Sequence, residues 1–274
     1  MSTVFNDFLL VMDDAGMQKH IMAFVFGCAR IAALVRFAAF AGPSVSMGIR
    51  MSLAVALYLP LHPLIYEQMP PVNYGELGSL LKMTLFFIKE GIIGFAMAML
   101  VSMLFYIAMA AGVIIDNQRG ASAAQVPDPF TEEQSSPLGN IFILAAVNLF
   151  LASGAFMAFV GILYSSYLYW PVFDFVPAIL NNRNAVFIAS EVDFLAEKSL
   201  MLAAPFVLTA LLCDIALGIM NRFAPQLNVY VLSMPIKSAI AAFLVILYMS
   251  PFYDFMHSLY PHMKQIFLNL TRMG

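Results

Sequence analysis

The side chains in this sequence that could carry out chemistry are few and widely spaced. Four histidines occur, at His20, His62, His257 and His262. Only the last two are near neighbours, and a spacing of five residues does not place both rings on one face of a helix. The two cysteines, Cys28 and Cys213, lie far apart in apolar stretches, where small buried side chains are expected. The sequence therefore predicts no metal site, no disulfide and no bound cofactor.

Short catalytic motifs are absent from the sequence as well. It contains no G-x-S-x-G, H-E-x-x-H or C-x-x-C pattern, and no glycine-rich phosphate loop. An intramembrane hydrolase would need a serine, aspartate or metal constellation, and Asp214 on its own does not make one. We therefore expect a protein that is not an enzyme.

The composition indicates a membrane protein. Of the 274 residues, 62% are hydrophobic and 11% are charged, whereas a soluble domain has roughly 45–50% apolar and about 25% charged residues. Lipid or a large protein partner must cover the excess apolar surface. The net charge of −3 gives no indication of nucleic-acid binding. Asp7, Asp13 and Asp14 interrupt the first stretch, so we expect no cleavable signal peptide.

Six apolar segments follow one another along the chain. They cover residues 20–41, 51–66, 83–115, 138–173, 199–221 and 238–253, with an amphipathic tail to Gly274. This pattern predicts an all-α, membrane-associated protein of about six long, kinked helices arranged as hairpins. A straight helix over residues 138–173 would be about 54 Å long, against about 30 Å for the bilayer core. We therefore expect a break at Gly154, and helices fitted to protein neighbours as well as to lipid.

Charged residues inside or beside the apolar segments are the next signal. They are Arg30, Arg36, Lys89, Glu90 and Asp214. In lipid each would cost roughly 2.5–3.5 kcal/mol at mid-helix, so these side chains must face protein, water or each other. Glu90 is expected to pair with Arg30 or Arg36, in a polar pore or an assembly interface. The alternative for Lys89 is that its side chain extends to the membrane surface.

A long polar insertion separates the third and fourth apolar segments. It begins with Asp116, Asn117, Gln118, Arg119 and Gly120, continues through Asp128, Pro129 and Phe130, and ends at Ser136-Pro137-Leu138-Gly139. Asp116 and Arg119 can pair if the helix continues through them, and Gly120 is a plausible helix stop. Long loops in compact helical proteins are often functional. We expect a lid, plug or docking role; a plain solvent loop is the alternative.

A second polar stretch reads as a helix, a polar tip and another helix. Its candidate docking residues are Asn221, Arg222, Pro225, Gln226, Asn228, Met234, Pro235 and Lys237. Pro225 suits the opening of the second arm, and Pro235 would kink that arm. Side chains able to hydrogen-bond are concentrated at the tip, which favours partner docking over a bare turn.

The residues of these two stretches carry a resemblance to a known family. The sequence LGIMNRFAPQLN at residues 217–228 resembles the signature of the type III export-apparatus family that contains the flagellar protein FliR and the injectisome protein SctT. Residues 116–121, Asp128-Pro129, 136–139 and 233–238 resemble the injectisome branch more than the flagellar one. The resemblance spans most of the chain. Before about residue 80 it is mainly one of hydropathy.

The resemblance implies a non-enzymatic core component of the type III export gate. Members of the family join R-type and S-type proteins in a hetero-oligomer within the secretion basal body, at the bacterial inner membrane. Within the single export-gate domain 1–274, residues 1–170 resemble the R-type partner and residues 171–274 the S-type partner. The resemblance implies further contacts with a switch-type protein at the cytoplasmic mouth, with inner rod and needle components, and with unfolded polypeptides in transit.

Roles for the two polar stretches also follow from the resemblance. Residues 116–139 correspond in place to the plug that blocks the closed channel, and the tip of the 221–238 hairpin would face the cytoplasm. A count of Lys and Arg residues favours the opposite orientation, and here we follow the resemblance. The alternative function is a self-contained polytopic membrane transporter or channel, which would show two repeated halves; no such repeat is evident in the sequence.

Overall fold

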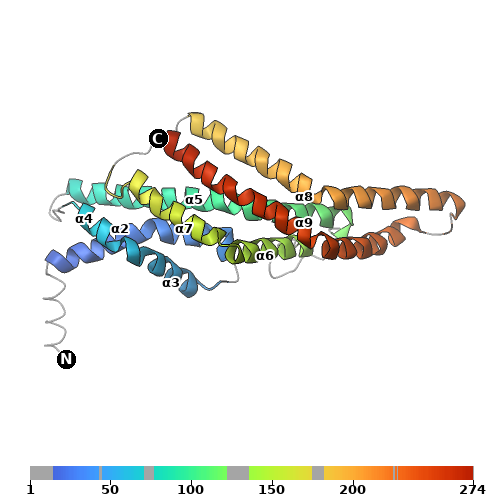
Figure 1. The fold of residues 1–274 in the computed structure, drawn as a ribbon, viewed down its shortest axis with the longest axis horizontal. Coiled ribbons are helices and arrows are strands. Elements are labelled where there is room, and N and C mark those ends of the chain that lie inside the picture. Colours follow the sequence, from blue (N-terminus) through green and yellow to red (C-terminus); the bar gives the residue numbers. More distant parts are fainter. Residues whose placement is uncertain are drawn as a thin grey trace, which may run out of the picture. The chain divides into compact units, whose positions relative to one another are not determined.

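The computed structural model describes residues 15–42, 45–70, 77–121, 136–174, 182–224, 226 and 228–273. Within these ranges the chain forms helices and no β-strand, which confirms the all-α prediction. The α-helices are α2 (Ala15–Phe37), α3 (Met47–Tyr58), α4 (His62–Gln68), α5 (Leu77–Gln118), α6 (Pro137–Ala152), α7 (Ala155–Tyr169), α8 (Asn182–Phe223) and α9 (Val229–Met273), as labelled in Figure 1. The 3₁₀ turns η1 (Ala39–Ala41) and η2 (Leu59–Leu61) flank α3.

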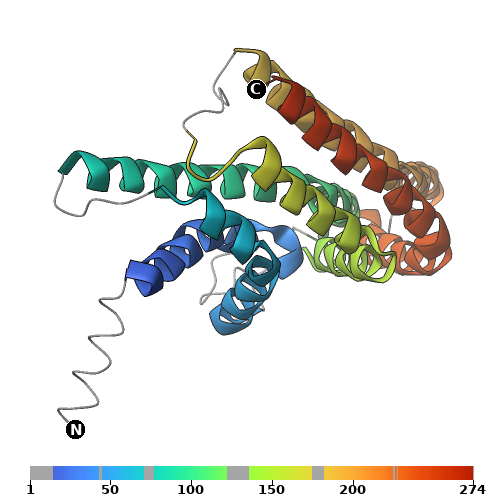
Figure 2. The same ribbon diagram turned by 60° about the vertical axis from the view of Figure 1, so that its left-hand side comes forward.

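The chain forms two compact units. Unit 1 comprises residues 1–102, 159–179 and 267–274, and unit 2 comprises residues 103–158 and 180–266. In unit 1, α2 packs against α3 and α4, as Figure 2 shows. Close helix contact there depends on glycine, because a Cβ at Gly27 would lie 2.4 Å from the Tyr58 ring.

Glycine also allows α5 to approach its neighbours closely in each unit. In unit 1, a Cβ at Gly94 would lie 2.1 Å from the backbone oxygen of Arg30 on α2. In unit 2, a Cβ at Gly112 would lie 2.4 Å from the backbone nitrogen of Gly139 on α6. Gly112 therefore allows the backbones of α5 and α6 to lie close together. Gly154 has no such neighbour within 4 Å, so its role is different.

Gly154 breaks the long apolar run as the sequence predicts. Its φ is +77°, a left-handed conformation that favours glycine. The run is split into α6 and α7, which meet at a bend of 75°. The 36-residue run is therefore not a single straight span.

Five helical segments in the described part of the chain are long and apolar enough to cross a membrane. The count becomes six if the bent α6–α7 pair forms one further span. The last two, α8 and α9, have 42 and 45 residues and extend well beyond the apolar segments 199–221 and 238–253. The start of α8 carries charged residues, which an apolar run cannot include. Helix α9 continues through Pro235, where the sequence predicts a kinked arm.

Candidate functional site

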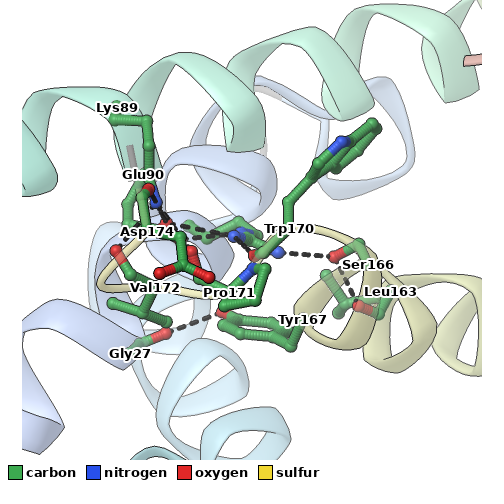
Figure 3. A network of polar contacts seen from close by, with 11 residues as sticks. Gly27, Lys89, Glu90, Leu163, Ser166, Tyr167, Trp170, Pro171, Val172 and Asp174 are labelled. Carbon is green, nitrogen blue, oxygen red and sulfur yellow. Dashed lines mark hydrogen bonds and ion pairs between the residues drawn. The ribbon is translucent and has the colours of Figure 1, made fainter. Parts of the chain in front are cut away.

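A buried charge cluster ties three helices of unit 1 together (Figure 3). Its members are Arg30 from α2, Lys89 and Glu90 from α5, and Ser166 from α7. Arg30 and Glu90 are completely buried. The guanidinium of Arg30 donates from Nε to Glu90 Oε2 at 2.7 Å and from Nη2 to Oε1 at 3.0 Å. Of the two predicted partners for Glu90, Arg30 is therefore right and Arg36, which is exposed in the last turn of α2, is wrong.

The remaining donors of Arg30 bind the end of α7. Nη1 donates to Ser166 Oγ at 2.9 Å, and Nη2 donates to the backbone oxygen of Trp170 at 2.7 Å. The ring of Tyr167 lies 4.1 Å from the guanidinium carbon, in cation–π contact. Two parallel bonds to a carboxylate are the strongest arrangement available to an arginine. The side chain is thus held from several sides.

Lys89 completes the cluster by binding backbone oxygens. Its Nζ donates to the carbonyls of Pro171, Val172 and Asp174 at 2.8, 2.7 and 2.9 Å, and lies 3.1 Å from Glu90 Oε1. Lys89 therefore has protein partners, as expected for a charge beside an apolar segment. The carbonyls follow the C-terminal end of α7, where the helix dipole is negative. They offset the surplus positive charge of two cations around one carboxylate.

A second set of polar contacts, which we call the loop clasp, lies in unit 2. It consists of Asp116 and Arg119 at the end of α5 and of Ser136 and Leu138 at the start of α6. The carboxylate of Asp116, 2% exposed, accepts from Arg119 Nε at 2.8 Å through Oδ1. Through Oδ2 it accepts from Ser136 Oγ at 2.5 Å and from Leu138 N at 3.0 Å. The predicted Asp116–Arg119 pair is confirmed.

The loop clasp also caps the helix that follows the loop. Ser136 is the N-cap of α6, and its hydroxyl oxygen accepts from the backbone nitrogen of Gly139 at 3.0 Å. At the other end, Gly120 has a φ of +79° and ends α5, as predicted. The described residues on either side of 122–135 are therefore joined to each other by hydrogen bonds.

Lys237 connects the α8–α9 hairpin to the loop clasp. Its Nζ binds Asp214 Oδ2 on α8 at 2.7 Å and lies 3.4 Å from the backbone oxygen of Gln118, the last residue of α5. The side chain of Met234 lies beside Gly120. An open pocket of about 270 Å³ adjoins this contact, lined by Arg119, Gly120, Ala121, Pro137, Met234, Pro235 and Ser238. Three of the polar motifs in the sequence thus meet at one place.

Comparison with known proteins identifies the family of this chain. Residues 21–263 match the family described as bacterial export proteins, family 1. The chain belongs to this family. It is 34% identical over 200 residues to Yop proteins translocation protein T of Yersinia pestis, covering 73% of this chain and 74% of that protein. It is 30% identical over 235 residues to surface presentation of antigens protein SpaR of Salmonella typhimurium, covering 85% of each.

A flagellar relative covers less of the chain. Flagellar biosynthetic protein FliR of Bacillus subtilis is 33% identical over 162 residues, covering 59% of this chain and 62% of that protein. The resemblance to the FliR/SctT family that the motifs indicated is therefore confirmed, together with its injectisome branch. The chain is accordingly similar to components of protein-export apparatuses, which are structural proteins.

The other predicted site residues of this export-family member lie mostly on its surface. Asn221, Arg222, Gln226 and Asn228 are exposed at the α8–α9 tip, and Asn117 is exposed near the end of α5. The neighbouring Phe223 is 82% exposed. Asp128, Pro129, Phe130 and Pro225 lie outside the described residues. A docking role for the tip remains a prediction.

Sequence reasoning missed several polar contacts in this family member. Arg50 is 9% exposed and donates to the backbone oxygens of Val45, Arg36 and Gly42. His262 binds Glu191 at 2.9 Å. A short apolar run gives no signal for such contacts, because their partners are backbone oxygens or distant in sequence. Among the described residues, no group of three or more His, Cys, Asp or Glu side chains could hold a metal ion.

Proposed function

We propose that this protein is a non-enzymatic core component of the type III export gate, and that it forms and closes an inner-membrane channel for unfolded proteins. Membership of the bacterial export family and the long apolar helices support an export role at the inner membrane. The proposed channel role depends on one observation. The end of α5, which carries the loop clasp, contacts the α8–α9 hairpin through Lys237 and Met234. Residues of the 116–121, 136–139 and 233–238 motifs take part in this contact.

The loop clasp supports a plug role for the 116–139 loop. A segment that closes a channel must be fixed at its base, so that only its middle can move aside. Asp116 supplies such a base, because one buried carboxylate binds the end of α5 and the start of α6. Lys237 extends this base to the hairpin. The plug is therefore attached to the part of the chain proposed to meet other proteins.

The exposed faces of α8 and α9 support assembly with other subunits. In the most apolar 18-residue stretch of each helix, 22% is buried in α8 and 6% in α9, compared with 61% in α5. Exposed apolar side chains on these two helices include Leu208, Leu212, Ile215, Ile219, Phe243 and Ile246. We propose R-type and S-type proteins as neighbours, with residues 171–274 in the S-type position. Some of this surface faces lipid in any arrangement.

The remaining partners follow from that placement within the basal body. The hairpin tip faces the cytoplasm and docks the switch-type protein, and the rod and needle lie on the far side. Replacing Arg222 by Glu at the tip should then reduce secretion. The matched control is Lys264→Glu, the same charge change at an exposed position of α9 away from the tip. Equal secretion by both variants would contradict the docking role.

The experiment that tests the assembly is co-expression with the R-type and S-type proteins, followed by native mass measurement of the detergent-solubilised complex. One copy of this chain in a larger hetero-oligomer is the expected result. A stable monomer or homodimer that does not bind these partners would instead favour a self-contained transporter or channel.

Shortening 122–135 while keeping the loop clasp should preserve assembly and let small ions leak. Unchanged ion permeability would contradict the plug role.

A further inference from the structure

Two histidines that are 42 residues apart in sequence face each other in unit 1. His20 lies near the start of α2, and His62 is the first residue of α4. Their ring nitrogens, Nδ1 of His20 and Nε2 of His62, are 3.0 Å apart. At this separation the two neutral rings share one proton in an N–H···N hydrogen bond. The contact joins the ends of two helices that pack together.

The surroundings hold both rings in place. The Nδ1 atom of His62 is hydrogen-bonded to the hydroxyl of Tyr58 at 2.5 Å, which orients the Nε2 atom toward His20. Tyr58 itself is 1% exposed, so it is a fixed support. The ring of His20 stacks on Tyr66 at 4.2 Å between centroids, while its own edge remains exposed to solvent. The planes of the two rings are inclined by 22° to each other with their centroids 5.2 Å apart, and the pair remains accessible.

We propose that His20 and His62 form a chelating site for a divalent transition-metal ion of the copper or zinc class. The ion binds to Nδ1 of His20 and Nε2 of His62, and the proton that lay between them moves through solvent to the other nitrogen of the ring that carried it, so that both ligands stay neutral. Metal–nitrogen bonds are about 2.0–2.1 Å long, so a 3.0 Å separation of the nitrogens corresponds to an angle of about 94° at the metal. The ion lies beside the line that joins the two nitrogens, and the exposed ring of His20 turns toward it on binding. An angle near 90° suits square-planar copper(II), the ion that such nitrogen sites hold most tightly.

The hydrogen bond between Nδ1 of His62 and the hydroxyl oxygen of Tyr58 has a specific role in this site, because Nδ1–H donates it when Nε2 holds the ion. Histidine ligands typically have their second ring nitrogen fixed by a hydrogen bond, and loss of that bond weakens metal binding by about 10–100-fold. Since the exposed side of His20 carries no further protein ligand among the described residues, water completes the coordination. The site therefore binds reversibly, and it joins α2 to α4 when it is loaded.

A nearby cation opposes metal binding. The Nζ atom of Lys19 lies 4.3 Å from the centre of the Tyr66 ring, on which His20 also stacks. Its positive charge repels a divalent ion, so removal of this charge should strengthen binding a few-fold, more at low salt than at high salt. A purely nonspecific metal contact elsewhere on the chain would not respond to this change.

The test is a copper(II) titration of the full chain, purified in detergent without a histidine tag and followed by electron paramagnetic resonance. One tight equivalent with nitrogen coordination is expected. His20→Ala and His62→Gln should each weaken it by at least about 100-fold, and Tyr58→Phe by about 10-fold. Lys19→Gln should strengthen it, and zinc(II) should compete. The matched control is His257→Ala, an exposed histidine that stacks on Tyr253 in unit 2.

Two outcomes would overturn the proposal. Unchanged affinity in the double variant His20→Ala/His62→Gln would place the ion elsewhere. Loss of binding in only one of the two single variants would show a single-histidine contact and no chelate. His20→Ala removes only an exposed ring, so it keeps the test decisive even if His62→Gln alters folding. Circular dichroism of each variant confirms that the helices are intact.

Discussion

Replacing Glu90 by Gln should destabilise unit 1 more than replacing Arg30 by Gln, even though Arg30 makes more hydrogen bonds. Without the carboxylate, two cations, the buried Arg30 and the partly buried Lys89, remain with no anion between them. Without the guanidinium, Glu90 keeps an ion pair with Lys89 at 3.1 Å. The net charge of the cluster thus rises to +2 in the first variant and falls to zero in the second.

The size of the difference follows from the burial of the pair. Arg30 and Glu90 are both 0% exposed, and removing one partner of a buried pair costs about 3–5 kcal/mol. We expect the Glu90 variant to lie in this range. The Arg30 variant should cost about 1–3 kcal/mol, the usual penalty for leaving buried polar groups unsatisfied. In a chain of this size the larger loss lowers the melting temperature by about 6–20 °C.

The assay can use a natural reporter inside the cluster. Trp170 is the only tryptophan of the chain, and its backbone oxygen accepts from Arg30. Thermal unfolding followed by tryptophan fluorescence therefore reports on this region directly. Glu67→Gln, the same substitution at an exposed position of α4, is the matched control and should melt as the wild type does. A greater loss in the Arg30 variant than in the Glu90 variant would refute the charge argument.

Three further predictions concern helix contacts and the loop clasp. Gly94→Ala should disrupt the packing of α5 against α2 and lower the melting temperature, whereas Gly91→Ala on the same helix, with no atom within 4 Å of its Cβ, should be neutral or stabilising in the same scan. Asp116→Asn should cost about 1–3 kcal/mol and increase protease cleavage within 122–135, since it loses a charge-assisted acceptor; unchanged cleavage would show that the loop clasp does not hold the loop. Lys237→Asp should reduce secretion, and the added change Asp214→Lys should restore part of it; no recovery would mean that their 2.7 Å contact is not what matters.

The helical class and the main break were predictable from the sequence because they depend on local properties. Long apolar runs specify helices, and one glycine in a run too long for a bilayer specifies a bend at Gly154. The Asp116–Arg119 pair was predictable for the same reason, since three residues along a helix place the two side chains together. That Glu90 needs a cationic partner followed from the cost of leaving its charge alone, but the sequence left Arg30 and Arg36 both open as that partner.

The rest of the site depends on contacts that no local pattern contains. Ser166 and the backbone oxygens after α7 serve Arg30 and Lys89, yet nothing in a charge-free run marks them as acceptors. Arg50 binds two backbone oxygens in the segment before its own helix and one in the last turn of α2. The pairing of His20 with His62 needs the packing of α2 on α4. Such partners are fixed by tertiary structure, which spacing alone does not predict.

The bend at Gly154 has a consequence for how the protein is made. Helices α6 and α7 have 16 and 15 residues, so each is only about 22–24 Å long and too short to cross the bilayer core of about 30 Å alone. During synthesis, α2 and α5 leave the ribosome before the carbonyls of residues 170–174 that their cations require. Unit 1 can therefore close only after translation has passed this point.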